Sequence, residues 1–490
     1  MFVLYCLLTV PGRLESLVNF QTMVASLTAM DIANASMLDE ATAAAEGMVM
    51  AFVSSQTKRK TFLVDSGVLP QTIAVLRTRA KGFGIRIVVG EVDILLPSED
   101  KMDVCGVLVQ YPDVNGAIRD FSQVAEKAHA VGGLLIVATD LLALTQLKPP
   151  GEWGADVVVG NTARFGVPTG YGGPHAAFFA VKDNLKRKMP GRLVGRSRDA
   201  DGKPAYRLSL QSKQISFGQK FEAQSIYSIA REQHIRREKA TSNICTSQAL
   251  LANVAAMYAV YHGPQGLRRI ADQVHGFTQV FVNTITGYGY KSINDSFFDT
   301  VTIDVAPVLT NAEDLHKRAQ EASINLRRID DKYVGVTFDE SITSQDLVSL
   351  INVFASGASA SSISLADLIE PEKSSVPEGL RRTSPFLPHL VFNKHHSETE
   401  LLRYVNHLAS KDLSLAHAMI PLGSCTMKLN STSSMIPLSW PQYANIHPFA
   451  PYDQVQGYHT VIKVRAQLSL SLSLNEIDAQ SRSLKTISAR

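Results

Sequence analysis

Apolar, β-branched runs that alternate with helix-like stretches are the feature that most constrains the fold of this chain. The stretches at 69–82 and 120–132 show the helical spacing, with apolar residues three and four positions apart. Strands that are apolar throughout and are separated by helices are typical of a mostly parallel sheet covered on both faces. The sequence therefore predicts an α/β fold that binds ligands at the carboxyl ends of its strands. The predicted strands span 61–66, 85–90, 104–112, 132–140, 155–161 and 175–181.

A smaller α+β domain is expected to follow this sheet in the chain. Two further strand-like runs lie at 297–307 and 332–338, and a helix-like stretch follows at 344–355. This order suits a small domain appended to a larger one. We therefore predict a large α/β domain over 12–287 and a small α+β domain over 288–355.

The rest of the chain divides by composition. Residues 356–379 are rich in Ser, Ala and Pro, which indicates a linker. A further unit is expected over 380–460, where Ser397 precedes an apolar helical pattern and has the signature of a helix N-cap. The final segment, 461–490, has only a weak alternation of Ser and Leu. We expect it to be poorly packed.

Composition excludes several classes of function. The 490 residues are 45% hydrophobic and carry 48 basic and 45 acidic side chains, for a net charge of +3. This balance gives no argument for binding nucleic acid or a membrane surface. The first ten residues are too few to span a bilayer, and no targeting signal is legible in them. No disulfide framework or metal site is expected, because no C-x-x-C pair occurs among Cys6, Cys105, Cys245 and Cys425.

Two features lie near the predicted carboxyl edge of the sheet. The glycine cluster RFGVPTGYGGPH, at 164–175, lies between two predicted strands and matches neither G-x-G-x-x-G nor a Walker A loop. We interpret it as a tight connection between strands, with a phosphate-holding loop as the alternative. Asp140 ends an apolar strand, where its carboxylate could reach a ligand or cap a following helix. Both interpretations of Asp140 remain open.

Two segments in the last third of the chain are more polar than a core element needs, NKHHSE at 393–398 and PLGSCTMKLN at 421–430. A cysteine can act as a nucleophile when a base such as histidine lies within reach. The commoner role of both cysteine and histidine in such segments is packing, which is the alternative here. Hydroxyl and ammonium groups suit an anionic ligand. The basic stretch 231–243 is interpreted as a solvated helix face, with a phosphate or partner site as the alternative. The candidate catalytic residues are His395, His396 and Cys425, and the candidate ligand-binding residues are Ser424, Thr426 and Lys428.

Long strings of this sequence closely resemble the P-protein family of the glycine cleavage system, glycine dehydrogenase (decarboxylating). The resemblance runs from about Gly12 to Tyr458. It is carried by strings such as GRLESLVNFQTMVASLTAMDIANASMLDEATAAAEGM, RFGVPTGYGGPHAAFFAVKDNLKRKMPGRLVG and SPFLPHLVFNKHHSETELLRYVNHLASKDLSLAHAMIPLGSCTMKLNSTSSMIP.

The resemblance implies a fold-type-I pyridoxal-phosphate enzyme built from two similar halves, as a homodimer or with a complementary carboxyl-terminal half. It implies decarboxylation of glycine and transfer of the aminomethyl group to the lipoyl group of the H protein, in the mitochondrion. It also makes His395, His396 and Cys425 candidates for a catalytic cleft. Pyridoxal phosphate is then the anionic ligand expected at Ser424, Thr426 and Lys428.

Several departures from the family pattern bear on activity. The lysine that holds the cofactor as a Schiff base belongs to the family's carboxyl-terminal half, and no lysine occurs between Lys148 and Lys182 in this chain. The resemblance makes Asp140 the counterpart of the aspartate that pairs with the cofactor's pyridine nitrogen. Residues 1–11 diverge, and 212–230 form a probable insertion.

Two hypotheses follow. The chain is either a P-protein enzyme that needs a separate carboxyl-terminal half, or a truncated, catalytically empty fragment or partner subunit that cannot hold pyridoxal phosphate covalently.

Overall fold

The computed structural model describes residues 11–56, 59–96, 103–199, 201–208, 248–358, 360–368, 374–411, 433 and 436–464. These residues form two units. The first unit takes its described residues from the ranges 1–167 and 174–428, and the second takes them from 168–173 and 429–490. The probable insertion at 212–230 and the segments 1–10 and 465–490 lie outside the described residues.

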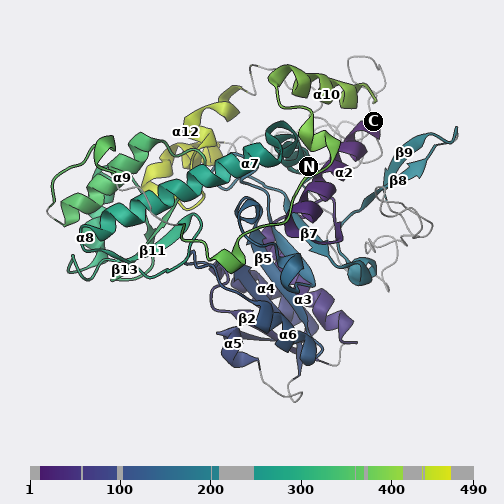
Figure 1. Cartoon of the computed structure of the whole chain (residues 1–490), viewed down its shortest axis with the longest axis horizontal. Coiled ribbons are helices and arrows are strands. Elements are labelled where there is room, and N and C mark those ends of the chain that lie inside the picture. The colour runs from purple at the N-terminus through teal and green to yellow at the C-terminus, as the bar shows by residue number, and fades with distance from the viewer. Residues whose placement is uncertain are drawn as a thin grey trace, which may run out of the picture. The chain divides into compact units, whose positions relative to one another are not determined.

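The core of the first unit is a seven-stranded sheet in the order β1-β7-β6-β5-β4-β2-β3 (Figure 1). The neighbours β3, β2, β4, β5 and β6 pair in parallel, whereas β7 and β1 pair antiparallel. The six predicted strands are confirmed, and β1 is an addition to them. The bounds are β1 Ile32–Ala33, β2 Thr61–Asp65, β3 Arg86–Gly90, β4 Val104–Tyr111, β5 Leu134–Asp140, β6 Val157–Asn161 and β7 Ala177–Val181.

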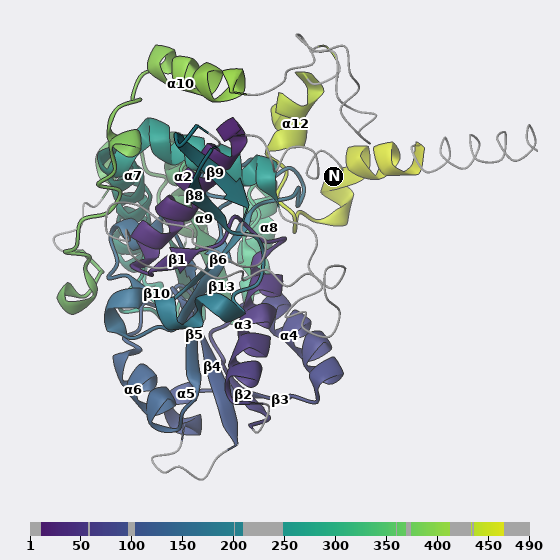
Figure 2. The same cartoon turned by 90° about the vertical axis from the view of Figure 1, so that its right-hand side faces the viewer.

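Helices cover both faces of this sheet (Figure 2). Along β5, Leu135 and Val137 belong to one apolar cluster while Ile136 and Ala138 belong to another, because successive side chains point to opposite faces. The first cluster includes side chains from α2, α6 and α7, and the second includes side chains from α3 and α4. The bounds are α2 Pro11–Thr28, α3 Glu40–Ser54, α4 Pro70–Phe83, α5 Val92–Leu95, α6 Ser122–Ala130 and α7 Ala249–Thr286.

A two-stranded antiparallel hairpin, β8 Val194–Arg198 and β9 Pro204–Leu208, follows the sheet. The side chain of Gln21 in α2 anchors it, because its Nε2 donates to the carbonyl of Val194 at 3.0 Å and its Oε1 accepts from the Val194 amide at 2.8 Å. Nothing in the sequence pattern predicted this hairpin.

The long helix α7 is broken at Gly263, which precedes Pro264 and has φ 61° and ψ −177°. Proline lacks an amide donor and clashes with the preceding turn, so a break here is expected. The side chain of His396 forms a hydrogen bond just before the break, because its Nδ1 lies 2.8 Å from the carbonyl oxygen of Tyr261. A carbonyl only accepts, so Nδ1 is the protonated ring nitrogen and donates this bond.

Replacing Gly263 by Ala is expected to lower the free energy of unfolding by about 2 kcal/mol. An added Cβ would lie 2.4 Å from Cε1 of His396 and 2.7 Å from the carbonyl oxygen of Phe392, at a positive φ. Denaturant unfolding of the full chain measures the loss. Gly276→Ala is the control, because nothing lies within 4 Å of its added Cβ. Equal stability of the two variants would contradict the steric argument.

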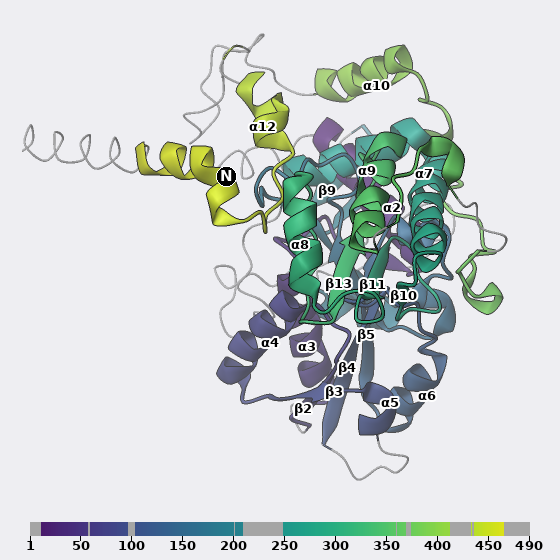
Figure 3. The same cartoon turned by 90° about the vertical axis from the view of Figure 1, so that its left-hand side faces the viewer.

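The small domain is a four-stranded antiparallel sheet in the order β10-β11-β13-β12 (Figure 3). Helices α8 and α9 and the second part of α7 pack on it in a separate apolar cluster. A capping box fixes the start of α9, because Thr343 and Asp346 bond reciprocally. The bounds are β10 Lys291–Ser292, β11 Thr300–Asp304, α8 Ala312–Glu321, β12 Arg327–Arg328, β13 Tyr333–Thr337 and α9 Ser344–Gly357.

The described parts of the predicted linker at 356–379 include packed residues. Ser375 donates from its hydroxyl to the carbonyl of Phe297 at 2.9 Å, and Val376 is buried in the core of the large domain. The helix predicted to begin after Ser397 is α10, Glu398–Ser410, and the Ser397 hydroxyl accepts from the Glu400 amide at 3.3 Å. That prediction is confirmed.

The second unit is small and is held by backbone bonds and aromatic contacts. The amides of Gly170 and Tyr171 donate to the carbonyls of Ala444 and Ile446, both at 2.7 Å. The ring of Tyr171 lies 4.8 Å from that of Tyr458, centroid to centroid. Its described elements include the short helix α12, Pro441–Ala444. In both units, no described helix is long and apolar enough to cross a membrane.

Candidate functional site

Polar side chains gather at the carboxyl edge of the large sheet, where the parallel strands end. Gln110 is near the end of β4, Asp140 ends β5 and Asn161 ends β6, while Glu40 begins α3 beside them. Ligands of open α/β sheets bind at this edge. The strand order therefore brings together residues that lie far apart in the sequence.

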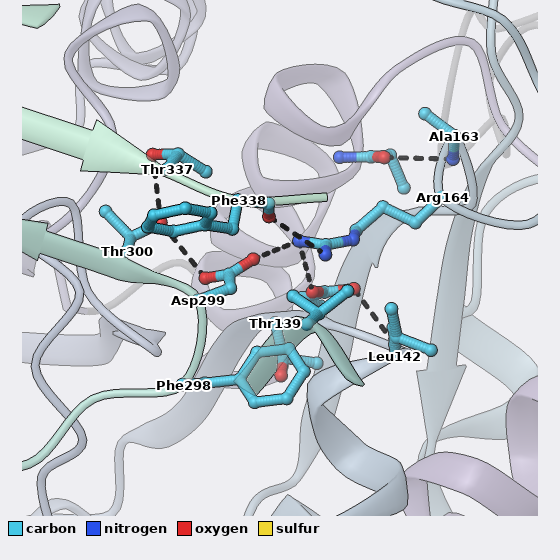
Figure 4. A network of polar contacts seen from close by, with 12 residues as sticks. Thr139, Leu142, Ala163, Arg164, Phe298, Asp299, Thr300, Thr337 and Phe338 are labelled. Atoms are coloured by element: carbon cyan, nitrogen blue, oxygen red, sulfur yellow. Dashed lines mark hydrogen bonds and ion pairs between the residues drawn. The ribbon is translucent and has the colours of Figure 1, made fainter. Parts of the chain in front are cut away.

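Arg164, three residues after β6, is the cation at this edge (Figure 4). Its Nη1 lies 3.2 Å from Oδ2 of Asp140 and also forms an ion pair with Asp299, which comes from the small domain. Its Nη2 donates to the carbonyl of Phe338 at 3.5 Å. Figure 4 shows the guanidinium directed at Asp299. The centre of the Phe298 ring lies 5.9 Å from the guanidinium carbon of Arg164. One guanidinium thus faces two carboxylates.

Burial and charge oppose one another in this network. Burial raises the pKa of Asp140, and the nearby Asp299 raises the pKa of Asp140 further. Two groups act in the opposite direction and favour the charged form of Asp140: the Arg164 guanidinium, and the Leu142 amide, which donates to Asp140 at 2.9 Å. The two carboxylates raise the pKa of Arg164 against the effect of burial. Arg164 therefore stays charged, and its guanidinium pairs with Asp140 and Asp299.

A second, deeper group surrounds Glu40. Asn161 donates from Nδ2 to Oε2 of Glu40 at 2.9 Å, and Gln110 is also within hydrogen-bonding reach of this carboxyl. Oε1 of Glu40 and Oε1 of Gln110 are both buried without a hydrogen-bond partner. Burial raises the pKa of Glu40 to about 7, and the nearby Asp140 adds to the rise. Glu40 is therefore partly protonated near neutral pH.

Pyridoxal phosphate, which the resemblance implies, does not fit the residues at this edge. The pyridinium group of the cofactor needs a free carboxylate, but Arg164 already occupies the carboxylate of Asp140. Phosphate groups favour a helix N-terminus with free amides, and one amide at the start of α3 is already occupied, because Asp39 accepts from the Thr42 amide at 2.7 Å. Glu40, the first residue of α3, adds a carboxyl group at this helix N-terminus. Residues 149–181 contain no lysine that could form a Schiff base.

The histidines predicted for the cleft have packing contacts. His396 donates to the Tyr261 carbonyl at the break in α7, and His395 stacks on Tyr404 with ring centroids 4.5 Å apart. Nδ1 of His395 is buried without a partner. Ser424, Cys425, Thr426 and Lys428 lie outside the described residues, so the cleft that the two polar segments were expected to share stays a prediction.

Sequence reasoning missed Glu40, Gln110 and Asp299 as members of this site. Asn161 offered a usable signal, because it ends an apolar run in the same way as Asp140. No metal site of three or more His, Cys, Asp or Glu side chains is found within the part of the chain that the structure describes. The described geometry is thus that of an ion-pair network beside a buried carboxyl.

Comparisons with known proteins match this architecture. Residues 8–354 match the family described as Glycine cleavage system P-protein. The chain is similar to the crystal structure of glycine decarboxylase (P-protein) of the glycine cleavage system in inhibitor-bound form. That similarity has 32% identity and a TM-score of 0.61, and it covers 71% of this chain and 76% of that chain. Sphingosine-1-phosphate lyase of Burkholderia pseudomallei is 10% identical, with a TM-score of 0.49 and coverage of 71% and 77%. The predicted fold-type-I architecture is confirmed.

Proposed function

Because this chain belongs to the glycine cleavage system P-protein family, we propose that it serves in glycine decarboxylation as the half of the P protein that does not hold pyridoxal phosphate. The observation that carries this proposal is the ion pair of Arg164 with Asp140 and Asp299, in a loop that has no lysine. A complementary carboxyl-terminal half then supplies the Schiff-base lysine.

The substrates and partners follow from the family. Glycine is the substrate, and the lipoylated H protein accepts the aminomethyl group. The mitochondrion is the proposed location. Pyridoxal phosphate, bound in the complementary half, supplies the electron sink for loss of carbon dioxide. The role of this chain is to fold, to pair with that half and to shape the assembly around it.

The alternative is that the chain is a catalytically empty fragment, which forms no active assembly with a carboxyl-terminal half. The same ion-pair network is consistent with this alternative too, because both proposals require that the edge site stay free of cofactor. They differ in whether a complementary half restores turnover.

The purified chain is expected to form no Schiff base at a defined lysine when pyridoxal phosphate is added. Absorption spectra, followed by borohydride reduction and peptide mass spectrometry, measure this, and a complete P protein is the positive control. Stoichiometric reduction at one lysine of this chain would overturn the proposal, whereas diffuse labelling of surface lysines would not count as Schiff-base formation.

Mixing the chain with a separately expressed carboxyl-terminal half distinguishes the proposed function from the empty fragment. Release of carbon dioxide from glycine, in the presence of lipoylated H protein and above the rate of the carboxyl-terminal half alone, supports the proposed function. No increase in that rate favours the empty fragment.

A further inference from the structure

Three neighbouring strands of the large sheet each place a polar side chain on the face that α3 covers. Gln110 of β4 lies level with Ala138 of β5, and Asp140 of β5 lies level with Asn161 of β6. Ala138 belongs to the apolar cluster that includes the side chains of α3. Because level neighbours and every second residue of a strand share one face, all three polar side chains lie on this face. Glu40, the first residue of α3, joins them there.

The hydrogen bonds of this group lack donors. Both polar atoms of the Asn161 side chain are used, because Oδ1 accepts from the Ala163 amide at 3.1 Å and Nδ2 donates to Oε2 of Glu40 at 2.9 Å. Within the part of the chain that the structure describes, Oε1 of Glu40 and Oε1 of Gln110 are buried without a hydrogen-bond partner. These side chains are only 8% and 7% exposed. A buried acceptor without a donor is unfavourable, so a donor is expected at this point.

The charges near Glu40 are also unbalanced. Arg164 pairs with Asp140 and Asp299, whereas the carboxyl of Glu40 forms no ion pair with any described residue. The neighbouring Asp140 disfavours the charged form of Glu40. When all three carboxyls are ionised, a single guanidinium compensates them. A ligand that carries positive charge as well as hydrogen-bond donors therefore matches this point better than water, which supplies only the donors.

A metal ion matches it less well. Calcium and magnesium ions bind about six oxygen ligands or more. The oxygens of Asp140 are already engaged, because Oδ1 accepts from the Leu142 amide and Oδ2 faces Arg164. Oδ1 of Asn161 is engaged by the Ala163 amide. The oxygens left over, on Glu40 and Gln110, are too few for a metal ion but suit the N–H groups of a small cation.

We propose that Glu40 and Gln110 bind an ammonium ion, whose N–H groups donate to Oε1 of each side chain and whose charge compensates the Glu40 carboxylate. The burial of both oxygens favours a ligand of about the size of a water molecule, which the ammonium ion has. This site goes beyond the proposed function and does not depend on it, because it needs neither pyridoxal phosphate nor a complementary half.

Denaturant unfolding of the full chain in ammonium chloride and in potassium chloride tests the site. The potassium ion has a similar size and the same charge, but it donates no hydrogen bond. At about pH 8 and about 100 mM of either salt, we expect an unfolding equilibrium constant about tenfold lower in ammonium chloride, because the ion binds only the folded chain. Glu40 is mostly ionised at this pH, since burial raises its pKa only to about 7.

Two variants remove the site in different ways. Gln110→Met removes one acceptor and keeps a similar length, and Glu40→Gln removes the negative charge. Both are expected to unfold equally in the two salts. Glu126→Gln is the matched control, because it removes an exposed carboxylate on α6 and should keep the tenfold difference of the parent.

Ammonium labelled with the heavy nitrogen isotope gives a second measurement that needs no variant. A buried ion exchanges its protons slowly, so the proton–nitrogen spectrum of the parent is expected to contain a separate signal of bound ammonium that excess potassium does not remove. The proposal is wrong if the parent is equally stable in the two salts and shows no such signal, which would mean that water alone meets the two oxygens. It is also wrong if folded Gln110→Met and Glu40→Gln proteins keep the tenfold difference, which would place the ion elsewhere.

Discussion

Replacing Arg382 by Met is expected to lower the free energy of unfolding by about 3–5 kcal/mol, the largest effect of a single substitution that we predict. Arg382 is 8% exposed. Its guanidinium donates to the carbonyls of Leu27 at 2.7 Å, Leu144 at 2.8 Å and Ser26 at 3.0 Å. The carbonyls at 26 and 27 belong to the last turn of α2, where helix carbonyls have no partner within the helix.

The charge of Arg382 matters as well as its hydrogen bonds. A cation at a helix C-terminus interacts favourably with the helix dipole. Burial lowers the pKa of Arg382 to about 10, although Glu152 opposes this effect, so the side chain is still protonated at neutral pH. Met has a similar length but loses the cation–π contact with Phe386, and it leaves four carbonyls, at 26, 27, 144 and 384, without the donor that Arg382 supplies.

Denaturant unfolding of the full chain measures this loss, with Arg77→Met as the control. Arg77 is exposed on α4, and its substitution is expected to change stability by less than about 0.5 kcal/mol. A loss below about 1 kcal/mol in Arg382→Met would show that water or neighbouring groups replace the lost donors.

The strands of the large sheet could be predicted from the sequence because burial on both faces makes them apolar throughout. All eight residues of β4 and all five of β2 are buried, as are the five central residues of β5. The β8–β9 hairpin could not be predicted, because VGRSR and PAYRL carry charged side chains and no clear alternation. Its anchor, Gln21, lies 173 residues away in the sequence from Val194.

The site was predictable only in part for the same physical reason. Asp140 ends an apolar run, so its place at the sheet edge follows from strand geometry. The pairing of Arg164 with Asp299 spans 135 residues and depends on how the small domain packs against the large one. Local spacing carries no information about such packing, and the same holds for Arg382 and the end of α2.

Replacing Glu40 by Gln is expected to make the chain more stable at slightly alkaline pH, by roughly 3 kcal/mol. Burial, opposed by the Asn161 hydrogen bond, raises the pKa of Glu40 to about 7 from 4.5. Between these two values the folded chain binds a proton that the unfolded chain has lost. The contribution of Glu40 to the free energy of unfolding therefore falls as the pH rises through this window, and the full cost is present above about pH 7.

Glutamine removes this cost and keeps the hydrogen bonds. Its Oε1 can accept from Asn161 as Oε2 of Glu40 does, and its Nε2 can donate to the oxygen of Gln110 that now lacks a partner. Denaturant unfolding from about pH 5 to about pH 8 should give similar stabilities at the low end and a growing advantage of Glu40→Gln as the pH rises. Glu126→Gln removes an exposed carboxylate and should follow the parent throughout. Parallel profiles for Glu40→Gln and the parent would show that Glu40 is ionised in the folded chain across this range, with its charge stabilised by groups other than Asn161 and Gln110.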